Sequence, residues 1–262
     1  MIKGEKSQYL SNSNTHTIGE TSQKLNIQEQ WQAQLIHKET NEHLSNYTVQ
    51  VSPGVFYNLI KRLLEIIIAG IGLIFTLPIM AFIAFLIRVD SSGPVIFRQK
   101  RIGRNRRYNR NGNGHLSDRR NGDLKGKPFE IYKFRTMKQN ADHYANSPRD
   151  NFDPRITRIG GIIRPLCLDE LPQLINVLKG DMSLIGPRPE MPFIVNDYND
   201  MERLRLAVKP GVTGLWQLYG SRKKHIHENL QYDLDYIRNR SFKLDLKIMI
   251  KTIGFMFGSK NV

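Results

Sequence analysis

Two adjacent carboxylates, Asp169 and Glu170, stand at the start of a helical pattern and are the first candidates for chemistry in this sequence. Apolar residues recur with the spacing of one helical face at Leu171, Leu174, Ile175 and Leu178. Gly180 is a typical helix stop, and Pro172 is tolerated only in a first turn, so the spacing places both carboxylates at the N-terminal end of this helix. There the helix dipole favours the ionised form, which can act as a nucleophile or a metal ligand. Taken alone, an acidic pair at a helix start is more often a simple cap.

Basic residues around the pair change that interpretation. Four arginines lie within a short stretch of sequence: Arg155, Arg158, Arg164 and Arg188. Arg188 stands between two prolines, which form a rigid mount, and the planar guanidinium group suits bidentate contact with phosphate. Residues 129–134 alternate like a strand that delivers Lys133 and Arg135 to the same region. Carboxylates among arginines, beside a membrane segment, indicate phosphoryl chemistry on a lipid or nucleotide phosphate.

The membrane segment is the apolar run of residues 66–87, which has 22 residues without a charge. As a straight helix it measures about 33 Å at about 1.5 Å per residue, and the hydrocarbon core of a bilayer is about 30 Å thick. A buried helix of a soluble protein rarely runs this far without a polar face. The sequence therefore predicts a membrane helix over residues 59–89.

Pro78, just past the middle of this run, indicates how the helix inserts, because proline kinks a helix. Basic residues flank the run on both sides, at Lys61, Arg62, Arg88, Arg98, Lys100, Arg101 and Arg104. Positive residues tend to stay on the cytoplasmic side. A re-entrant helix that bends at Pro78 and leaves by the face it entered fits this distribution better than a spanning one. A kinked spanning helix with its N-terminal tail outside is the alternative.

Other segments complete the organisation. Residues 1–58 have the polar composition of a disordered or weakly helical leader. The start of the chain leads into no apolar run, which excludes a cleaved signal peptide. Residues 90–262 are the expected cytoplasmic catalytic domain. Within it, residues 104–127 form a basic loop, better explained as a solvated insertion than as a contact with lipid phosphates. Residues 244–257 favour an interfacial amphipathic helix over a plain C-terminal core helix.

The composition of the 262-residue chain predicts an anionic partner. Lysine and arginine number 39 against 24 acidic residues, a formal net charge of +15, which suits nucleic acid, phospholipid or a polyphosphate substrate. A single cysteine, Cys167, excludes an intrachain disulfide and a cysteine-rich zinc site. The sequence carries no recognition-helix, RNA-binding or zinc-finger signature. A membrane-tethered nucleic-acid binder is therefore the weaker alternative.

Four motifs together resemble one protein family. They are KFRTM (133–137), DPRITRIG (153–160), LDELPQLINVLKGDMSLIGPRPE (168–190) and KPGVTGLWQL (209–218). From about residue 61 to residue 257 the chain is similar to the bacterial sugar transferases, polyprenyl-phosphate phosphoglycosyl transferases that insert into one leaflet. It looks like a short form that lacks the four-helix N-terminal module of larger members. The resemblance implies a mostly helical α/β fold, with a re-entrant helix and a small catalytic domain, monotopic at the cytoplasmic face of the inner membrane.

The resemblance also implies roles for individual residues. The family's catalytic Asp-Glu dyad matches Asp169 and Glu170, which are also the expected Mg²⁺ ligands. Its phosphate-facing arginine matches Arg164, and the arginine of its Pro-Arg-Pro motif matches Arg188. Lys133, Arg135, Arg155 and Arg158 are the further candidates for binding phosphate. Two family serines, at the membrane bend and before the dyad, are replaced here by Leu77 and Cys167.

The implied reaction moves a sugar 1-phosphate from a UDP-sugar to a polyprenyl phosphate such as undecaprenyl phosphate, with release of UMP. Asp169 attacks the β-phosphate to give a sugar phosphoryl-aspartate, which the lipid phosphate then attacks. Mg²⁺ is expected because the diphosphate charge must be neutralised and oxygen ligands are present. The product is the first lipid-linked unit of an exopolysaccharide, capsule, O-antigen or glycoprotein glycan.

The expected partners are therefore the UDP-sugar, the polyprenyl phosphate and an anionic lipid bilayer, and not a nucleic acid. A catalytically silent scaffold of a glycan-assembly complex is the other alternative, against which the intact dyad argues. Trp216 either stacks on uracil or lies in the core or at the lipid interface. The sequence leaves open which sugar is carried, how long the prenyl chain is, and whether the protein forms a homodimer.

Overall fold

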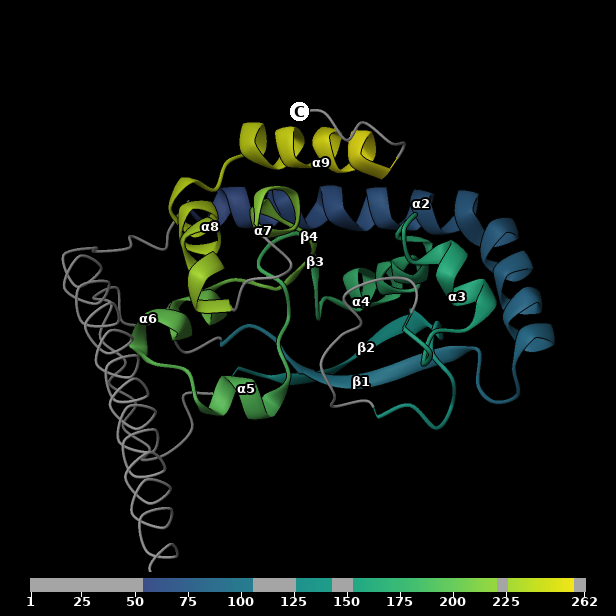
Figure 1. Ribbon diagram of the computed structural model, residues 1–262. Helices are drawn as coiled ribbons and strands as arrows, with labels where there is room; N and C mark the ends of the chain where they lie inside the picture. Colours follow the sequence, from purple (N-terminus) through teal and green to yellow (C-terminus); the bar gives the residue numbers. More distant parts are fainter. Residues whose placement is uncertain (1–53, 106–125, 143–152, 221–225, 257–262) are drawn as a thin grey trace, which may run out of the picture. The chain divides into compact units, whose positions relative to one another are not determined.

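The computed structural model describes residues 54–105, 126–142, 153–220 and 226–256 (Figure 1). These residues belong to one compact unit that begins at Val49. Helices predominate and the strands are few and short among them, in agreement with the predicted mostly helical α/β class. The predicted leader, residues 1–58, lies outside the described residues except for its last five. The predicted basic loop, residues 104–127, lies outside them except for two residues at each end.

The helices of the described chain are α2 (Val55–Asp90), α3 (Arg158–Ile163), α4 (Gln173–Lys179), α5 (Pro192–Asn196), α6 (Asp200–Arg203), α7 (Leu215–Tyr219), α8 (Ile226–Asn239) and α9 (Phe242–Met256). The strands are β1 (Ile96–Ile102), β2 (Pro128–Phe134), β3 (Ser183–Ile185) and β4 (Gly211–Thr213). Two 3-10 turns, η1 (Leu168–Glu170) and η2 (Leu204–Ala207), link them.

Strands β1 and β2 form an antiparallel pair, with Ile96 opposite Phe134 at one end and Ile102 opposite Pro128 at the other. The strand predicted over residues 129–134 is confirmed. Strand β1, which follows α2, spans seven residues, and its polar second half pairs fully with β2. This pair supports the site described below.

The core of the described residues consists of small apolar clusters, and two of them include residues of α2. One cluster joins α2 to β2, α4 and the start of β3: Ala69, Phe129, Ile131, Val177 and Met182. A second joins the C-terminal half of α2 to β2 and α3: Ile83, Ile87, Phe134 and Ile163. Strands β3 and β4 form a short parallel pair, with Ser183 opposite Gly211, that the sequence did not predict. Both halves of α2 are thus packed into the unit.

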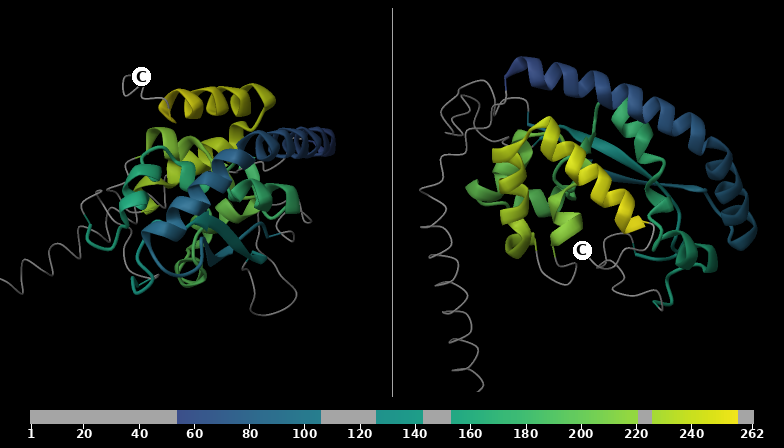
Figure 2. Two further views of the ribbon diagram at one scale, coloured as in Figure 1. Left: turned by 90° about the vertical axis from the view of Figure 1, so that its right-hand side faces the viewer. Right: turned by 90° about the horizontal axis from the view of Figure 1, so that it is seen from above.

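Helix α2 is continuous over 36 residues and bends in its second half (Figures 1 and 2). It begins four residues earlier and ends one residue later than the membrane helix predicted over residues 59–89. Pro78 is the proline inside it, and its missing N–H weakens the helix locally. The Thr76 hydroxyl donates a hydrogen bond to the Gly72 carbonyl at 2.7 Å, a contact that tends to bend helices. Leu77 stands where the resemblance implies a serine at the bend, and Thr76 supplies a hydroxyl one residue earlier.

Both ends of α2 contact the same unit. Near its N-terminus, Lys61 forms an ion pair with Asp245 of α9 at 2.6 Å, and Arg62 donates to the carbonyl of Val177 at 2.6 Å. At its C-terminus, the Asp90 carboxylate accepts a hydrogen bond from the backbone N–H of Ile159 at 3.1 Å. The helix therefore lies along the rest of the unit, and both of its ends stay in contact with it.

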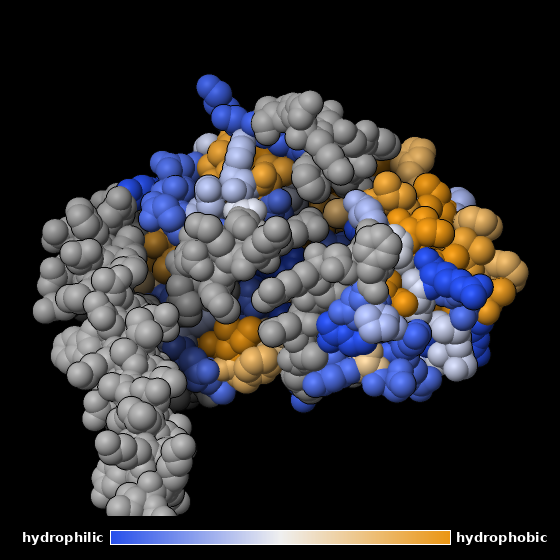
Figure 3. Space-filling model, in the orientation of Figure 1, coloured by the Kyte–Doolittle hydropathy of each residue, from blue (hydrophilic) through white to orange (hydrophobic). Residues whose placement is uncertain are grey.

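The outer side of α2 is apolar and exposed. It is long and apolar enough to cross a membrane, and only 11% of its most apolar window of 18 residues is buried, so it is not the core helix of a soluble domain. Figure 3 shows apolar side chains gathered where α2 bends in Figure 1. Helix α9 buries Ile248 but exposes a stripe at helical spacing: Phe242, Leu246, Ile250 and Ile253. This pattern agrees with the amphipathic helix predicted over residues 244–257.

Candidate active site

The two carboxylates lie on the 3-10 turn η1, immediately before α4. The sequence predicted both carboxylates at the N-terminal end of a helix that stops at Gly180, and in the structure they lie just before that helix: α4 begins at Gln173, and Pro172 is its N-cap residue. The chain enters η1 through Cys167 in the left-handed region, with φ 55°. The stop at Gly180 is confirmed, with φ 83°. Asp169 and Glu170 therefore precede the helix rather than occupy its first turn.

Burial dominates the electrostatics of Asp169. It raises the pKa of this carboxyl from 3.8 to about 6, although Lys133 and two arginines lower it and Glu170 raises it further. The sequence led us to expect that the helix dipole favours the ionised form; the nearby positive charges do favour it, but desolvation of the carboxylate outweighs them. With a pKa of about 6, Asp169 is still mostly ionised at neutral pH and available as a nucleophile.

Glu170 is held by the cations around it. Its carboxylate accepts a hydrogen bond from Lys133 Nζ at 2.5 Å, and Arg188 Nη1 lies 3.9 Å from the same oxygen. Lys133 comes from β2, and Arg188 from the segment after β3. Arg164, in the turn after α3, is close enough to lower the pKa of Asp169. The structure thus brings together Asp169, Glu170, Lys133, Arg164 and Arg188 from four parts of the sequence.

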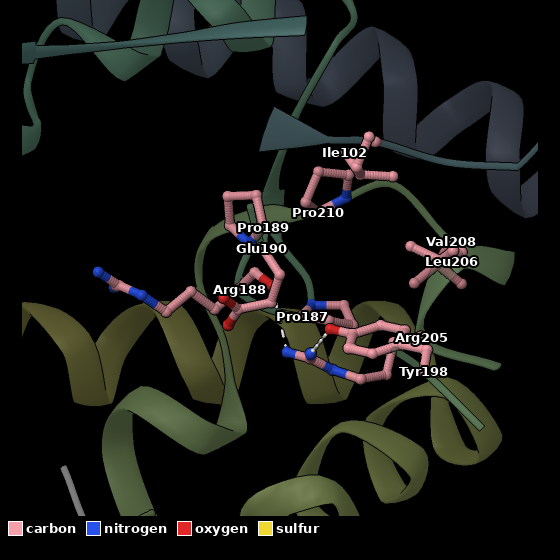
Figure 4. A pocket seen from close by; sticks show the side chains of 11 residues that line it. Ile102, Pro187, Arg188, Pro189, Glu190, Tyr198, Arg205, Leu206, Val208 and Pro210 are labelled. Atoms are coloured by element: carbon pink, nitrogen blue, oxygen red, sulfur yellow. Dashed lines mark hydrogen bonds between the residues drawn. The ribbon is translucent and has the colours of Figure 1, made fainter. Parts of the chain in front are cut away.

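A buried ion pair fixes the backbone that carries Arg188. Arg205 pairs with Asp233 at 2.7 Å, contacts the Tyr198 hydroxyl, and donates to the carbonyl of Arg188 at 3.2 Å. In Figure 4 the Arg188 side chain points away from Arg205 while its carbonyl faces Arg205. The Arg188 guanidinium lies 5.7 Å from the ring centre of Trp216, which is close enough for a cation–π contact. The predicted rigid mount thus has a buried support.

Three more arginines predicted to bind phosphate form no ion pair with Asp169 or Glu170 among the described residues. Arg135 is buried and donates to the carbonyls of Ser91 and Ser92 at 2.6 Å each, so it anchors the turn after α2. Arg155 forms an ion pair with Asp153 at 2.7 Å. Arg158 is exposed at the start of α3. The alternation that predicted β2 did not show that Lys133 and Arg135, two residues apart, would have different partners.

Two residues of the site were missed by the sequence analysis. A small pocket is lined by Arg101 and Gln217 together with Lys133, Glu170 and Arg188. Burial lowers the pKa of Arg101 to about 10, with a further contribution from Arg188. The sequence analysis counted Arg101 only as a flank of the membrane segment. In the β1–β2 pair, Arg101 and Lys133 fall on the same face by alternation, so the signal appears once the pairing is known.

The predicted Mg²⁺ requires oxygen ligands. Among the described residues there is no group of three or more side chains that could hold a metal ion. Asp169 and Glu170 remain as an adjacent carboxylate pair, with Lys133 and Arg188 beside Glu170. Mg²⁺ is commonly bound by one or two carboxylates together with substrate phosphates. The donor set fits that mode, and it does not provide an all-protein cage.

Comparison with known proteins adds to this geometry. Residues 56–259 match the family described as bacterial sugar transferase. Over 219 residues the chain is 37% identical to the UDP-N-acetylgalactosamine-undecaprenyl-phosphate N-acetylgalactosaminephosphotransferase of Aeromonas hydrophila. That alignment covers 81% of this chain and 47% of the relative. The chain is 36% identical over 208 residues to the UDP-glucose:undecaprenyl-phosphate glucose-1-phosphate transferase of Escherichia coli K12, covering 76% of this chain and 40% of that protein.

A shorter relative is covered almost completely. The chain is 37% identical over 204 residues to an uncharacterized sugar transferase of Bacillus subtilis strain 168, covering 78% of this chain and 90% of that protein. By contrast, the chain spans less than half the length of the Aeromonas and Escherichia relatives. Residues 56–259, which match the family, include the carboxylates and the cations around them.

Proposed function

Because the chain belongs to the bacterial sugar transferase family, we propose that it transfers a sugar 1-phosphate from a UDP-sugar to a polyprenyl phosphate, such as undecaprenyl phosphate, and releases UMP. The observation that carries this proposal is the pairing of Asp169 and Glu170 with cations from separate elements. Carboxylates supply a nucleophile, and lysine and arginine neutralise a diphosphate. The product is the first lipid-linked unit of a surface glycan.

In the first step, a carboxylate oxygen of Asp169 attacks the β-phosphorus of the UDP-sugar. The bond from that phosphorus to the bridging oxygen breaks, and UMP leaves with the bridging oxygen and its electron pair. The sugar phosphate remains on Asp169 as an acyl phosphate. Lys133 and Arg188 neutralise the charge that develops on the phosphoryl oxygens. Glu170 holds the Lys133 ammonium group in place through their 2.5 Å contact.

In the second step, a phosphate oxygen of the polyprenyl phosphate attacks the same phosphorus and expels the Asp169 carboxylate. The carboxylate is regenerated with its electron pair, and no net proton transfer is required between ionised phosphates. The polyprenyl diphosphate sugar leaves in the membrane. Asp169 and Glu170 would hold Mg²⁺ together with the diphosphate, and the ion would neutralise phosphate charge.

We also propose that the protein is monotopic and lies on the cytoplasmic face of the inner membrane. The support is the docking of both ends of α2 on one unit, together with the exposed apolar residues of α2 and α9. A helix that crossed the bilayer would carry one end away from that unit. Bilayer contact along α2 and α9 would also place the carboxylates at the interface, where a lipid phosphate and a soluble nucleotide sugar meet.

The test is UMP release by the purified full chain in nanodiscs that contain undecaprenyl phosphate. UDP-glucose, UDP-galactose, UDP-N-acetylglucosamine and UDP-N-acetylgalactosamine are supplied separately with Mg²⁺. Release that depends on the lipid acceptor and on one or more of these donors is expected. Mass spectrometry of a reaction quenched without acceptor should find the phosphosugar on the peptide that contains Asp169. No release with any donor would contradict the transferase and favour a catalytically silent scaffold.

A further inference from the structure

The amide of Gln217 is buried in the pocket of the active site without a partner. Gln217 lies on α7 and lines the pocket with Glu170 and Arg188. Both its Oε1 and its Nε2 are shielded from solvent, and no described residue hydrogen-bonds to either atom. Buried amides of folded proteins are hydrogen-bonded with few exceptions, and each exception calls for an explanation. A carboxamide that faces a pocket with both of its atoms unsatisfied indicates a ligand that satisfies them.

Close backbone packing fixes the position of α7. Gly214 precedes α7, and Gly186 precedes the Pro187–Pro189 segment. A Cβ atom at Gly214 or at Gly211 would collide with the backbone of Gly186, so only glycine permits this approach. The helix that carries Gln217 is thereby held against the segment that carries Arg188. The amide is a preorganised group rather than a side chain on a free loop.

The other polar groups of the pocket define which part of a substrate Gln217 can contact. Arg101, Lys133 and Arg188 line the same pocket, and their charges suit a diphosphate. An uncharged carboxamide adds no charge to that binding. It offers one donor group and one acceptor, which suits a neutral group with both functions. In a UDP-sugar, the imide edge of uracil and the sugar hydroxyl or N-acetyl groups have this chemistry.

We propose that Gln217 is a substrate-contacting residue that hydrogen-bonds a neutral donor–acceptor group of the UDP-sugar beside the diphosphate. This inference rests on the proposed function for the identity of the ligand. The amide is unsatisfied in the free protein, and the bound substrate supplies its partners. Removal of the amide therefore weakens substrate binding without lowering the stability of the free protein. An amide with a structural role would show the opposite.

The test compares Gln217→Met, which keeps the length of the side chain but removes the amide, with the wild type. The matched control is Gln231→Leu, because Gln231 is exposed on α8 and bonds to Asp235. We expect Gln217→Met to raise the KM for the UDP-sugar at least about tenfold, as for a lost hydrogen bond in a buried site. Its melting temperature without substrate should equal or exceed that of the wild type. The control variant should change neither the KM for the UDP-sugar nor the melting temperature.

A second measurement identifies the contacted part of the substrate. The inhibition constant for UMP rises in Gln217→Met if the amide contacts uracil, and stays at the wild-type value if it contacts the sugar. Either result, with a raised KM for the UDP-sugar, supports the proposal. An unchanged KM overturns it, and so does a lower melting temperature with unchanged substrate binding. If Gln217→Met does not fold, Gln217→Asn withdraws the amide by one methylene, and an unchanged KM in that variant overturns the proposal equally.

Binding also separates this proposal from the transferase function. The rise in melting temperature caused by UMP or by each UDP-sugar is measured on wild-type and variant protein, without lipid acceptor. Wild-type protein that binds these ligands but releases no UMP would contradict the transferase alone. A wild-type shift in melting temperature that Gln217→Met preserves with every ligand would contradict the role of Gln217 alone.

Discussion

The partly buried carboxylate of Asp169, the proposed nucleophile, should lower the stability of the protein, and Asp169→Asn tests this. The pKa of Asp169 is raised from 3.8 to about 6, chiefly by burial, so the ionised carboxylate is less stable in the folded chain than in the unfolded one. Somewhat more than two pKa units at about 1.36 kcal/mol each correspond to about 3 kcal/mol. Asparagine has nearly the same shape and no charge. The variant should be more stable than the wild type by up to that amount at pH 7.5, and should release no UMP.

The pH dependence of this difference follows from the direction of the shift. Below about pH 4 the carboxyl is protonated in both states, so the wild type carries no penalty. The penalty grows as pH rises through the interval from 3.8 to about 6, and it is complete above that interval. The stability gained by Asp169→Asn should therefore fall from about 3 kcal/mol at pH 7.5 to about half of that at pH 5.

The assay is chemical unfolding of the detergent-solubilised protein with EDTA and without nucleotide, followed by circular dichroism at both pH values. Asp197→Asn is the control, because Asp197 is exposed after α5, and its stability should stay within about 0.5 kcal/mol of the wild type. A variant at position 169 that is no more stable than the wild type at pH 7.5 would refute the reasoning. So would a gain that does not shrink at pH 5.

Four further changes test other parts of the structure. Arg188→Ala removes the proposed contact with phosphate, which is worth about 1.5–3 kcal/mol, so kcat/KM for UMP release should fall at least about tenfold, and unchanged kinetics would exclude Arg188 from the site. Asp233→Asn leaves a buried arginine without its counter-charge, which should cost about 3–5 kcal/mol in chemical unfolding; a loss below about 1 kcal/mol would contradict that. Single cysteines at positions 40 and 120, in a cysteine-free background, should both resist an impermeant maleimide in intact cells, and labelling at position 40 alone would show a spanning helix. Pro78→Ala should favour such labelling and lower UMP release.

The sequence predicted the parts of the site that depend on local pattern. Alternation predicted β2 and its Lys133, and the Pro-Arg-Pro segment predicted a rigid mount for Arg188. Helical spacing predicted α4 and its end at Gly180, but not the separate turn η1 before it. A proline at position 172 is compatible with a first helical turn and with a break before the helix, and local spacing does not decide between these.

Long-range contacts determine which basic residues lie at the site, and local sequence patterns could not predict this. Arg135 and Lys133 are two residues apart, yet one anchors a turn near Ser91 and the other reaches Glu170. Local sequence gave no means to separate them, because the difference depends on where the turn after α2 lies. Arg101 was overlooked for the same reason, since its place in the pocket follows only from the β1–β2 register.

The bent half of α2 and the chemical site share one apolar cluster. Ile83 and Ile87 of α2 pack against Phe134, the residue after Lys133 in the chain, and against partly buried leucines at positions 168 and 171 that flank the two carboxylates. The position of the dyad is therefore tied to the direction of the membrane helix after its bend. Partial burial raises the pKa of Asp169 in the same region. If α2 lies in the membrane as proposed, its packing against the turn that carries Asp169 links the position of the proposed nucleophile to the bend of the helix.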